Sequence, residues 1–390
     1  MTPKPGIDVL LNSNPNWKQQ RIGFVTNHAA KTKEGIPSRH ALLQHQFNIV
    51  KLFSPEHGLD VTGADGVWID DGNDTLTGLP IISLYGKKLQ PDAHDLKNID
   101  LMLFDIPDVG ARFYTYLWTL SYILEAAGSF QIPLIIADRP NPVSGKFDLV
   151  EGPMLDISCA SFIGRWPMPI RHSCTLGELA QYFNKALQIK APLIVIPVEG
   201  YERNCFQPDW GNAFEPTSPA IQSFEAALCY CGTVFLEATN ISEGRGTPYS
   251  FFAAGAPWMN ATAVAFNFNQ IALPTVEAVT IQFITYTGKY TGETCNGIVL
   301  KIQDREKFHP VLMGLLLIKV IKDLHPDDFA WQGYVTNVNP NGKNHLDKLL
   351  GFPDSKALFE TNMEKFIQQI NKKLNVNISW QTTMKPYLLY

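Results

Sequence analysis

The segment SPEHG at residues 54–58 holds the strongest chemical candidate in the sequence, Glu56. The segment follows an apolar run. Pro55 restricts the backbone before the glutamate, and Gly58 permits a tight turn after it. A carboxyl group held at such a turn between apolar walls has a raised pKa and can act as a general acid. The alternative interpretation is a solvated loop glutamate without a catalytic role.

A second cluster of reactive side chains lies in NISEGRGT at 240–247, after a long apolar run. Its glycines let the backbone approach a ligand closely. Arg245 could form a bidentate pair with a carboxylate, either on the protein or on a substrate. The alternative is an internal salt bridge between Glu243 and Arg245 that shapes the turn.

Regular elements must position these side chains, and the first half of the chain alternates short apolar runs with helical patterns. We expect strands at 21–27, 47–53, 100–106 and 133–138, with a helix between the last two. Near-continuous apolar strands separated by helices favour a parallel sheet covered on both faces. The predicted fold class is therefore α/β, with a Rossmann-like parallel-sheet domain at 1–160 and an α+β auxiliary domain at 161–390 that completes a cleft.

Each predicted strand ends in polar residues that a buried strand does not require. The carboxyl ends of parallel strands lie along one edge of an open sheet, where ligands bind. We therefore expect one converging polar pocket. The alternative is that these side chains only cap the following helices. The candidate residues near these ends are Asn27, Glu56, His57, Asp105, Asp108, Arg112, Tyr114, Asp138, Arg139 and Asn141, with Glu151 of VEGP as a further candidate.

The remaining segments are less regular. The stretch from Asp60 to Gln90, rich in glycine and aspartate, is expected to be a long excursion near the same edge of the sheet. Helices are expected at 175–187, around 310–324 and around 355–374. Cys229 and Cys231 flank Tyr230 in an apolar run, which favours one face of a strand.

The composition excludes several classes of function. The formal net charge is −5, and no basic run points to nucleic acid or an anionic membrane surface. VTNHAAKTKEG stands where a dinucleotide-binding fold carries G-x-G-x-x-G, and a P-loop is missing too, so we expect no cofactor. The six scattered cysteines show no zinc-like spacing with histidines, so we expect no metal. The longest apolar run, at 311–318, is too short to span a membrane and predicts a buried helix.

Taken together, the motifs resemble the bacterial exo-β-N-acetylmuramidases of peptidoglycan recycling. The resemblance runs from Gly6 to the C-terminus through FSPEHG, SLYGK, FDIPDVGARFYTY, DRPNP, VEGP, GELA, and TNISEGRGT followed by GAPW. It implies a glycoside hydrolase that releases N-acetylmuramic acid from the non-reducing end of muramyl saccharides or muropeptides. Glu56 would be the general acid/base, and Glu243 and Arg245 would be further site residues.

The chain departs from the family pattern at two places. Pro107 stands where the family commonly has glutamine, and Ala220-Ile221-Gln222 stands near its Pro-His-Met stretch, which puts the pocket rim in doubt. The first residues show no charged stretch followed by an apolar run, so no signal peptide is expected. The family usually carries an export signal. The resemblance therefore implies a periplasmic or secreted protein, with a cytoplasmic one as the alternative.

Glycoside hydrolysis usually needs two carboxyl groups across the scissile bond. Glu56 can be one. The other could be Glu243, Asp105 or Asp108, or the acetamido group of the substrate could assist. Muramic acid also carries a lactyl carboxylate, for which the candidate partners are Arg112, Arg139 and Arg245. The alternatives are a different hydrolase of acidic or cell-wall sugars and a non-catalytic muropeptide-binding protein. The oligomeric state stays open.

Overall fold

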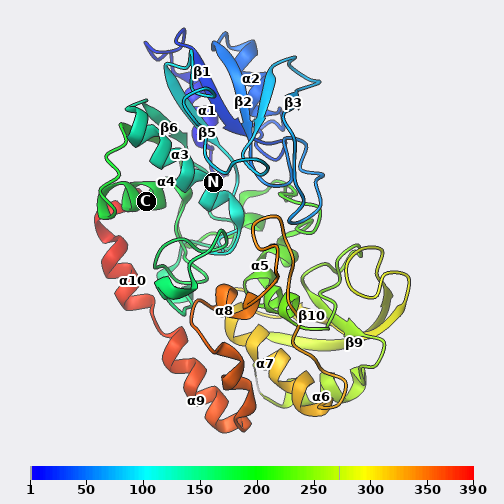
Figure 1. The fold of residues 1–390 in the computed structure, drawn as a ribbon. Coiled ribbons are helices and arrows are strands. Elements are labelled where there is room, and N and C mark those ends of the chain that lie inside the picture. Colours follow the sequence, from blue (N-terminus) through cyan, green and yellow to red (C-terminus); the bar gives the residue numbers. More distant parts are fainter. Residues whose placement is uncertain (1, 272) are drawn as a thin grey trace.

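The computed structural model describes residues 2–271 and 273–390, which form two lobes (Figure 1). The N-terminal lobe is built on a seven-stranded sheet with the order β3-β4-β2-β1-β5-β6-β7. Its strands are β1 (Ile22–Thr26), β2 (Ile49–Ser54), β3 (Gly72–Asn73), β4 (Pro80–Ser83), β5 (Leu101–Asp105), β6 (Leu134–Ala137) and β7 (Leu193–Ile196). Every pairing is parallel except that of β3 with β4. The α/β class and the four strands predicted from the apolar runs are confirmed.

The central strands are buried on both faces, which explains why they are apolar at nearly every position. β1, β5 and β6 are buried along their whole length. Because side chains alternate across a strand, Phe24 packs into the cluster that contains helix α1 (Gly6–Asn12) and α2 (Ser38–Gln44). Its neighbour Val25 packs into the opposite cluster, with α3 (Thr115–Phe130) and α4 (Leu176–Ala186).

The C-terminal lobe combines a three-stranded antiparallel sheet with helices (Figure 1). Its strands are β8 (Ala253–Ala256), β9 (Val276–Ile284) and β10 (Thr294–Ile302), and its helices are α5 (Phe224–Thr233), α6 (Ala261–Gln270), α7 (Pro310–Leu324), α8 (His345–Leu350) and α9 (Met363–Leu374). A Cβ atom on Gly232 of α5 would lie 1.8 Å from the carbonyl oxygen of Pro310. The close packing of α5 on α7 therefore requires glycine there. No helix of the described residues combines the length and hydrophobicity needed to cross a bilayer.

Three predictions about elements need correction. The boundary after residue 160 is too early for the sheet, because β7 pairs with β6 in the N-terminal lobe. The strand predicted around Cys229 and Cys231 is wrong, since both lie in helix α5, which is buried nearly all round and so shows no polar face to reveal its period. The helix predicted at 355–374 is divided into a 3-10 turn at Ser355–Glu360 and α9, because Asn362 caps α9 by accepting a hydrogen bond from the Lys365 N–H.

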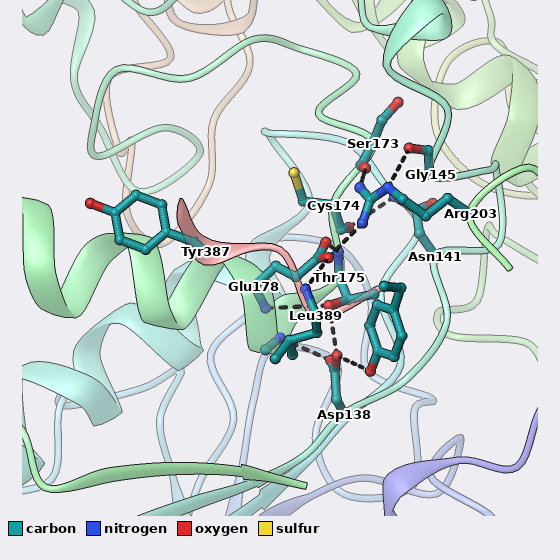
Figure 2. A network of polar contacts seen from close by, with 12 residues as sticks. Asp138, Asn141, Gly145, Ser173, Cys174, Thr175, Glu178, Arg203, Tyr387 and Leu389 are labelled. Atoms are coloured by element: carbon teal, nitrogen blue, oxygen red, sulfur yellow. Dashed lines mark hydrogen bonds and ion pairs between the residues drawn. The ribbon is translucent and has the colours of Figure 1, made fainter. Parts of the chain in front are cut away.

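The C-terminus returns to the N-terminal lobe after helix α10 (Asn377–Met384), and the end of the chain lies beside α4 (Figure 1). The hydroxyl of Tyr390 donates to Asp138 Oδ2 at 2.8 Å and accepts from the Val198 N–H at 2.8 Å. The Leu389 N–H donates to Glu178 Oε1 at 3.1 Å (Figure 2). These contacts fasten the C-terminus to the strand ends of the first lobe.

Replacing Tyr390 with Phe should lower the free energy of unfolding. The change leaves the buried Val198 N–H and the Asp138 carboxyl each without one partner, and an unpaired buried group costs about 1–3 kcal/mol. Urea denaturation measures the loss. Tyr387→Phe is the matched control, because its hydroxyl makes no hydrogen bond within the described residues. Equal stability of the two variants would show that the C-terminal contacts do not hold the lobe.

Candidate active site

A cavity lies between the two lobes. The N-terminal lobe contributes the loop after β2, Tyr85 beyond β4, and the start of α3. The C-terminal lobe contributes α5, the turn at 243–247, the 334–339 segment and α8. The polar side chains that line it are Glu56, His57, Asp65, Tyr85, Tyr114, Thr115, Ser161, Ser218, Tyr230, Glu237, Arg245, Tyr334, Thr336, Asn339, His345 and Lys348.

Glu56 is buried in this cavity, with 3% of its surface exposed. It follows the last residue of β2 by one proline, so the sheet fixes its position. Its Oε1 accepts a hydrogen bond of 2.9 Å from the Gly66 N–H. Burial, and then the negative charge of Asp65, raise the pKa of Glu56, although the Gly66 N–H and the Thr115 hydroxyl act in the opposite direction. The raised pKa shifts Glu56 toward the protonated form, which is the form that a general acid requires.

Asp65 is the second carboxyl group of the cavity, and the sequence patterns did not single it out. Its nearest oxygen lies within 4.8 Å of a Glu56 oxygen and of a His57 ring nitrogen. Burial alone would raise the pKa of Asp65. The charge of Arg245 and a hydrogen bond from the Tyr334 hydroxyl outweigh burial and lower it. The two neighbouring carboxyls are thus pushed in opposite directions, and Asp65 stays ionised.

Arg245 holds this arrangement together from the C-terminal lobe. Its Nε donates to Glu243 Oε1 at 2.7 Å, and its Nη2 lies 2.5 Å from Glu237 Oε1. The same Nη2 lies 3.7 Å from Asp65 Oδ2. The internal salt bridge considered as the alternative for the SEGRGT turn is therefore present.

Glu243 itself does not line the cavity. It is 3% exposed and is paired with both Arg245 and Lys289, the latter at 3.1 Å. Burial would raise the pKa of Glu243, but these two cations lower it. Glu243 therefore positions Arg245, and the prediction of Glu243 as a catalytic carboxylate is not supported by its place in the structure.

Glu56, His57 and Asp65 also have the residue types of a metal site. Arg245 and the Tyr334 hydroxyl already contact Asp65, and His57 Nδ1 lies 2.8 Å from the Gly63 carbonyl oxygen. A cation placed among the three would compete with the guanidinium. The donor set fits an acid pair stabilised by arginine better than a metal centre.

The expectation that all strand ends converge on one pocket is wrong. A second cavity lies at the ends of β1, β5 and β6, and it is lined by Asp108 and Arg139. Arg139 is bound to Asp105, with Nε to Oδ1 at 2.5 Å and Nη2 to Oδ2 at 2.9 Å. Asp105 is fully buried and lines neither cavity, so its predicted catalytic role is not supported. Thr217 lines the second cavity and Ser218 the first, so this segment divides the two.

Two further candidates fix the helix that follows β6. Asp138 accepts hydrogen bonds from the Thr175 hydroxyl at 2.6 Å and the Gly177 N–H at 2.8 Å, at the N-terminus of α4 (Figure 2). Burial raises the pKa of Asp138 to about 6. Asn141 donates to the carbonyl oxygen of Cys174 at 3.0 Å. The helix-capping alternative is therefore correct for this strand end.

Glu151 and Arg112 join the lobes instead of facing the cavity. Glu151 accepts from the N–H groups of Val311 and Leu312, at 3.1 and 3.0 Å, and so caps α7. Arg112 is fully buried and donates to three carbonyl oxygens, those of Pro153, Met168 and Leu349.

Four of the predicted residues do meet in the first cavity, namely Glu56, His57, Tyr114 and Arg245. The Tyr114 hydroxyl donates to Thr217 Oγ1 at 2.7 Å, so Tyr114 forms part of the wall between the cavities. Asn27 is fully buried outside both cavities, and neither atom of its amide has a hydrogen-bond partner among the described residues.

Comparison with known proteins finds matches along both lobes. Residues 22–225 match the family model described as exo-beta-N-acetylmuramidase NamZ, N-terminal, and residues 228–390 match its C-terminal counterpart. The chain is 38% identical over 392 residues to the peptidoglycan beta-N-acetylmuramidase NamZ of Bacillus subtilis (strain 168), covering 99% of this chain and 91% of that protein.

Two solved structures from Bacteroides fragilis NCTC 9343, both described as DUF1343 family proteins, have the same fold. They are 26% and 25% identical to this chain, with TM-scores of 0.87 and 0.76, and each match covers 100% of this chain and 99% of the other. The two family models together span both lobes and the cavity between them. The chain therefore belongs to the NamZ family of exo-beta-N-acetylmuramidases, which are glycoside hydrolases.

Proposed function

We propose that this protein hydrolyses terminal N-acetylmuramic acid from the non-reducing end of peptidoglycan fragments, with Glu56 as the general acid. Membership of the family and the similarity to the Bacillus subtilis enzyme support the substrate class. The observation that carries the mechanism is the pair formed by Glu56 and Asp65. These carboxyls lie within 4.8 Å of each other and have pKa values shifted in opposite directions.

In this mechanism Glu56 protonates the glycosidic oxygen as the bond to the leaving group breaks. Asp65 stays ionised and stabilises the positive charge that develops at the anomeric carbon, or attacks it. The nearest oxygens of the two carboxyls lie within 4.8 Å of each other, which is less than the roughly 6.5–9.5 Å that leaves room for a water in inverting enzymes. The geometry therefore favours retention, with either Asp65 or the acetamido group of the substrate as the nucleophile.

Exo action requires a cavity that is closed at one end. The 60–90 excursion and the 334–339 segment meet there, because the Asn337 N–H donates to the Gly66 carbonyl oxygen at 2.8 Å. Gly66 has a φ of 68°, and a Cβ atom there would lie 2.7 Å from Thr336. Glycine is therefore required for this close approach between the lobes. The contact supports a cavity that is closed beside Glu56. A terminal sugar could enter such a cavity, but a continuing glycan chain could not pass through it.

Replacing Glu56 with Gln should lower kcat for a chromogenic β-N-acetylmuraminide by about 100-fold or more while substrate binding is retained, because proton donation contributes 10²–10⁴-fold. Steady-state kinetics and calorimetric binding measure the two effects. Glu364→Gln, on the exposed face of α9, is the control. Unchanged turnover would remove Glu56 from the mechanism. Binding without turnover by the wild-type protein would favour the muropeptide-binding alternative, and faster cleavage of the glucosaminide would favour a different cell-wall hydrolase.

The pH dependence of kcat/KM should be bell-shaped. Activity falls on the alkaline side as Glu56 loses its proton at a raised pKa, and on the acid side as Asp65 gains one at a lowered pKa. Asp65→Asn removes the charge that raises the pKa of Glu56, so the alkaline limb of the residual activity should move to lower pH. An alkaline limb that stays in place in this variant would show that the two carboxyls are not coupled.

The first sugar released should be the β-anomer of N-acetylmuramic acid, because the short carboxyl spacing favours retention. Proton NMR of the anomeric signals, recorded within the first minutes of the reaction and before mutarotation, distinguishes the anomers. Release of the α-anomer first would require a water between the acid and the base, and would contradict the assignment of Asp65 as the partner of Glu56.

A further inference from the structure

Among the described residues, one cationic side chain on the cavity wall, Lys348, has no carboxylate partner. Arg245 contacts three carboxylates, and His345 Nε2 lies 3.0 Å from Glu237 Oε2. Lys348 is the remaining lysine or arginine on the wall, and no carboxylate oxygen of the described residues lies within 4.0 Å of its Nζ. An ammonium group at the surface of a substrate cavity without a counter-ion is a candidate for an anion on the substrate.

The position of Lys348 is fixed by its helix. Leu346, Leu349 and Leu350 of α8 are buried, and Arg112 Nη2 donates to the Leu349 carbonyl oxygen at 2.7 Å. The Nζ of Lys348 donates to Asn339 Oδ1 at 2.7 Å, and a neutral amide oxygen leaves the positive charge uncompensated. Burial lowers the pKa of Lys348, so a bound anion would stabilise its charged form.

Ser161 supplies a second, independent observation on the same cavity. Its hydroxyl oxygen is buried and has no hydrogen-bond partner among the described residues. The backbone of Ser161 exchanges two hydrogen bonds with Gly164, at 2.8 and 3.1 Å, which hold the residue in a tight turn. A buried hydroxyl without a partner costs free energy, and that cost disappears when a ligand accepts a hydrogen bond from it.

The polar cluster beside Glu56 does not suit a substrate carboxylate. Arg245 and Lys289 face three carboxylates there, those of Asp65, Glu237 and Glu243, so the local charge repels an anion. The other two arginines considered for this role are also engaged. Arg112 is bound to carbonyl oxygens inside the protein, and Arg139 is paired with Asp105 in the second cavity. The carboxylate of a muramyl ring must therefore lie elsewhere in the cavity.

We propose that Lys348, assisted by the hydroxyl of Ser161, binds the lactyl carboxylate of N-acetylmuramic acid and so selects muramyl over glucosaminyl substrates. This inference rests on the proposed function, because it takes the same cavity as the sugar site. The ring would then lie with its anomeric carbon at the Glu56–Asp65 pair and its lactyl group toward α8. Lys348 is a specificity residue and takes no part in proton transfer.

The test uses a chromogenic β-N-acetylmuraminide, its lactyl methyl ester and the matching glucosaminide. Lys348→Met should lower kcat/KM for the free acid about 10- to 100-fold, which is the range of one charge-assisted hydrogen bond, and should leave the ester and the glucosaminide within about 3-fold. Lys348→Arg should restore most of the activity on the free acid. Ser161→Ala should give a smaller loss, also confined to the free acid. Lys343→Met, an exposed lysine outside the cavity, is the matched control.

Calorimetric binding of N-acetylmuramic acid and its methyl ester provides a readout that does not depend on turnover. The wild-type protein should bind the acid more tightly than the ester, and Lys348→Met should abolish the difference. Equal losses on acid and ester, or a wild-type protein without preference for the acid, would overturn the role of Lys348. Failure of the wild-type protein to cleave any muraminide would instead overturn the proposed function, and the binding difference would still decide the role of Lys348.

Discussion

The contact of Arg245 and Tyr334 with Asp65 is the interaction on which the rest of the site depends. Glu56 is buried, and a second ionised carboxyl group within 4.8 Å makes ionisation of Glu56 costly. The arginine and the tyrosine stabilise the charge on Asp65, and burial together with that charge raises the pKa of Glu56. Because these stabilising groups come from the C-terminal lobe and the carboxyls from the N-terminal lobe, the acid pair exists only when the lobes are in contact.

Several buried contacts around the site hold the two lobes in a fixed relative position. Arg112 ties the segment after β5 to the carbonyl of Leu349 in α8, and Glu151 caps α7 of the other lobe. Tyr390 fastens the C-terminus to Asp138 at the end of β6. Arg112 and Glu151 are buried and form hydrogen bonds across long sequence separations, so a shift of one lobe against the other would leave several polar groups without partners. These side chains position the two lobes, and none of them lines the cavity.

Sequence reasoning predicted the N-terminal lobe well and the site only in part, for a physical reason. Parallel strands that are buried on both faces can be recognised in the sequence, because burial requires a run of apolar residues. Glu56 can be predicted because it closely follows such a run. Asp105 ends strand β5 and Asp108 follows it, yet the ends of the strands open into two cavities, and Asp105 is paired with Arg139. The type of a polar residue after a strand does not show whether it caps a helix, forms an ion pair or takes part in catalysis.

The sequence by itself determined the class of fold, the family, the position of Glu56 at the end of β2 and the glycine-flanked turn that carries Arg245. Those features are local, because they depend on residue type, period and spacing. The tertiary structure alone decided that Asp65, from an excursion without any period, stands beside Glu56, and that Arg245 serves the carboxyls of the protein. It also decided that the positive charge of Lys348 has no carboxylate partner among the described residues. The packing of the two lobes brings together charged residues that lie far apart in the sequence, and no local sequence pattern predicts which of them will pair.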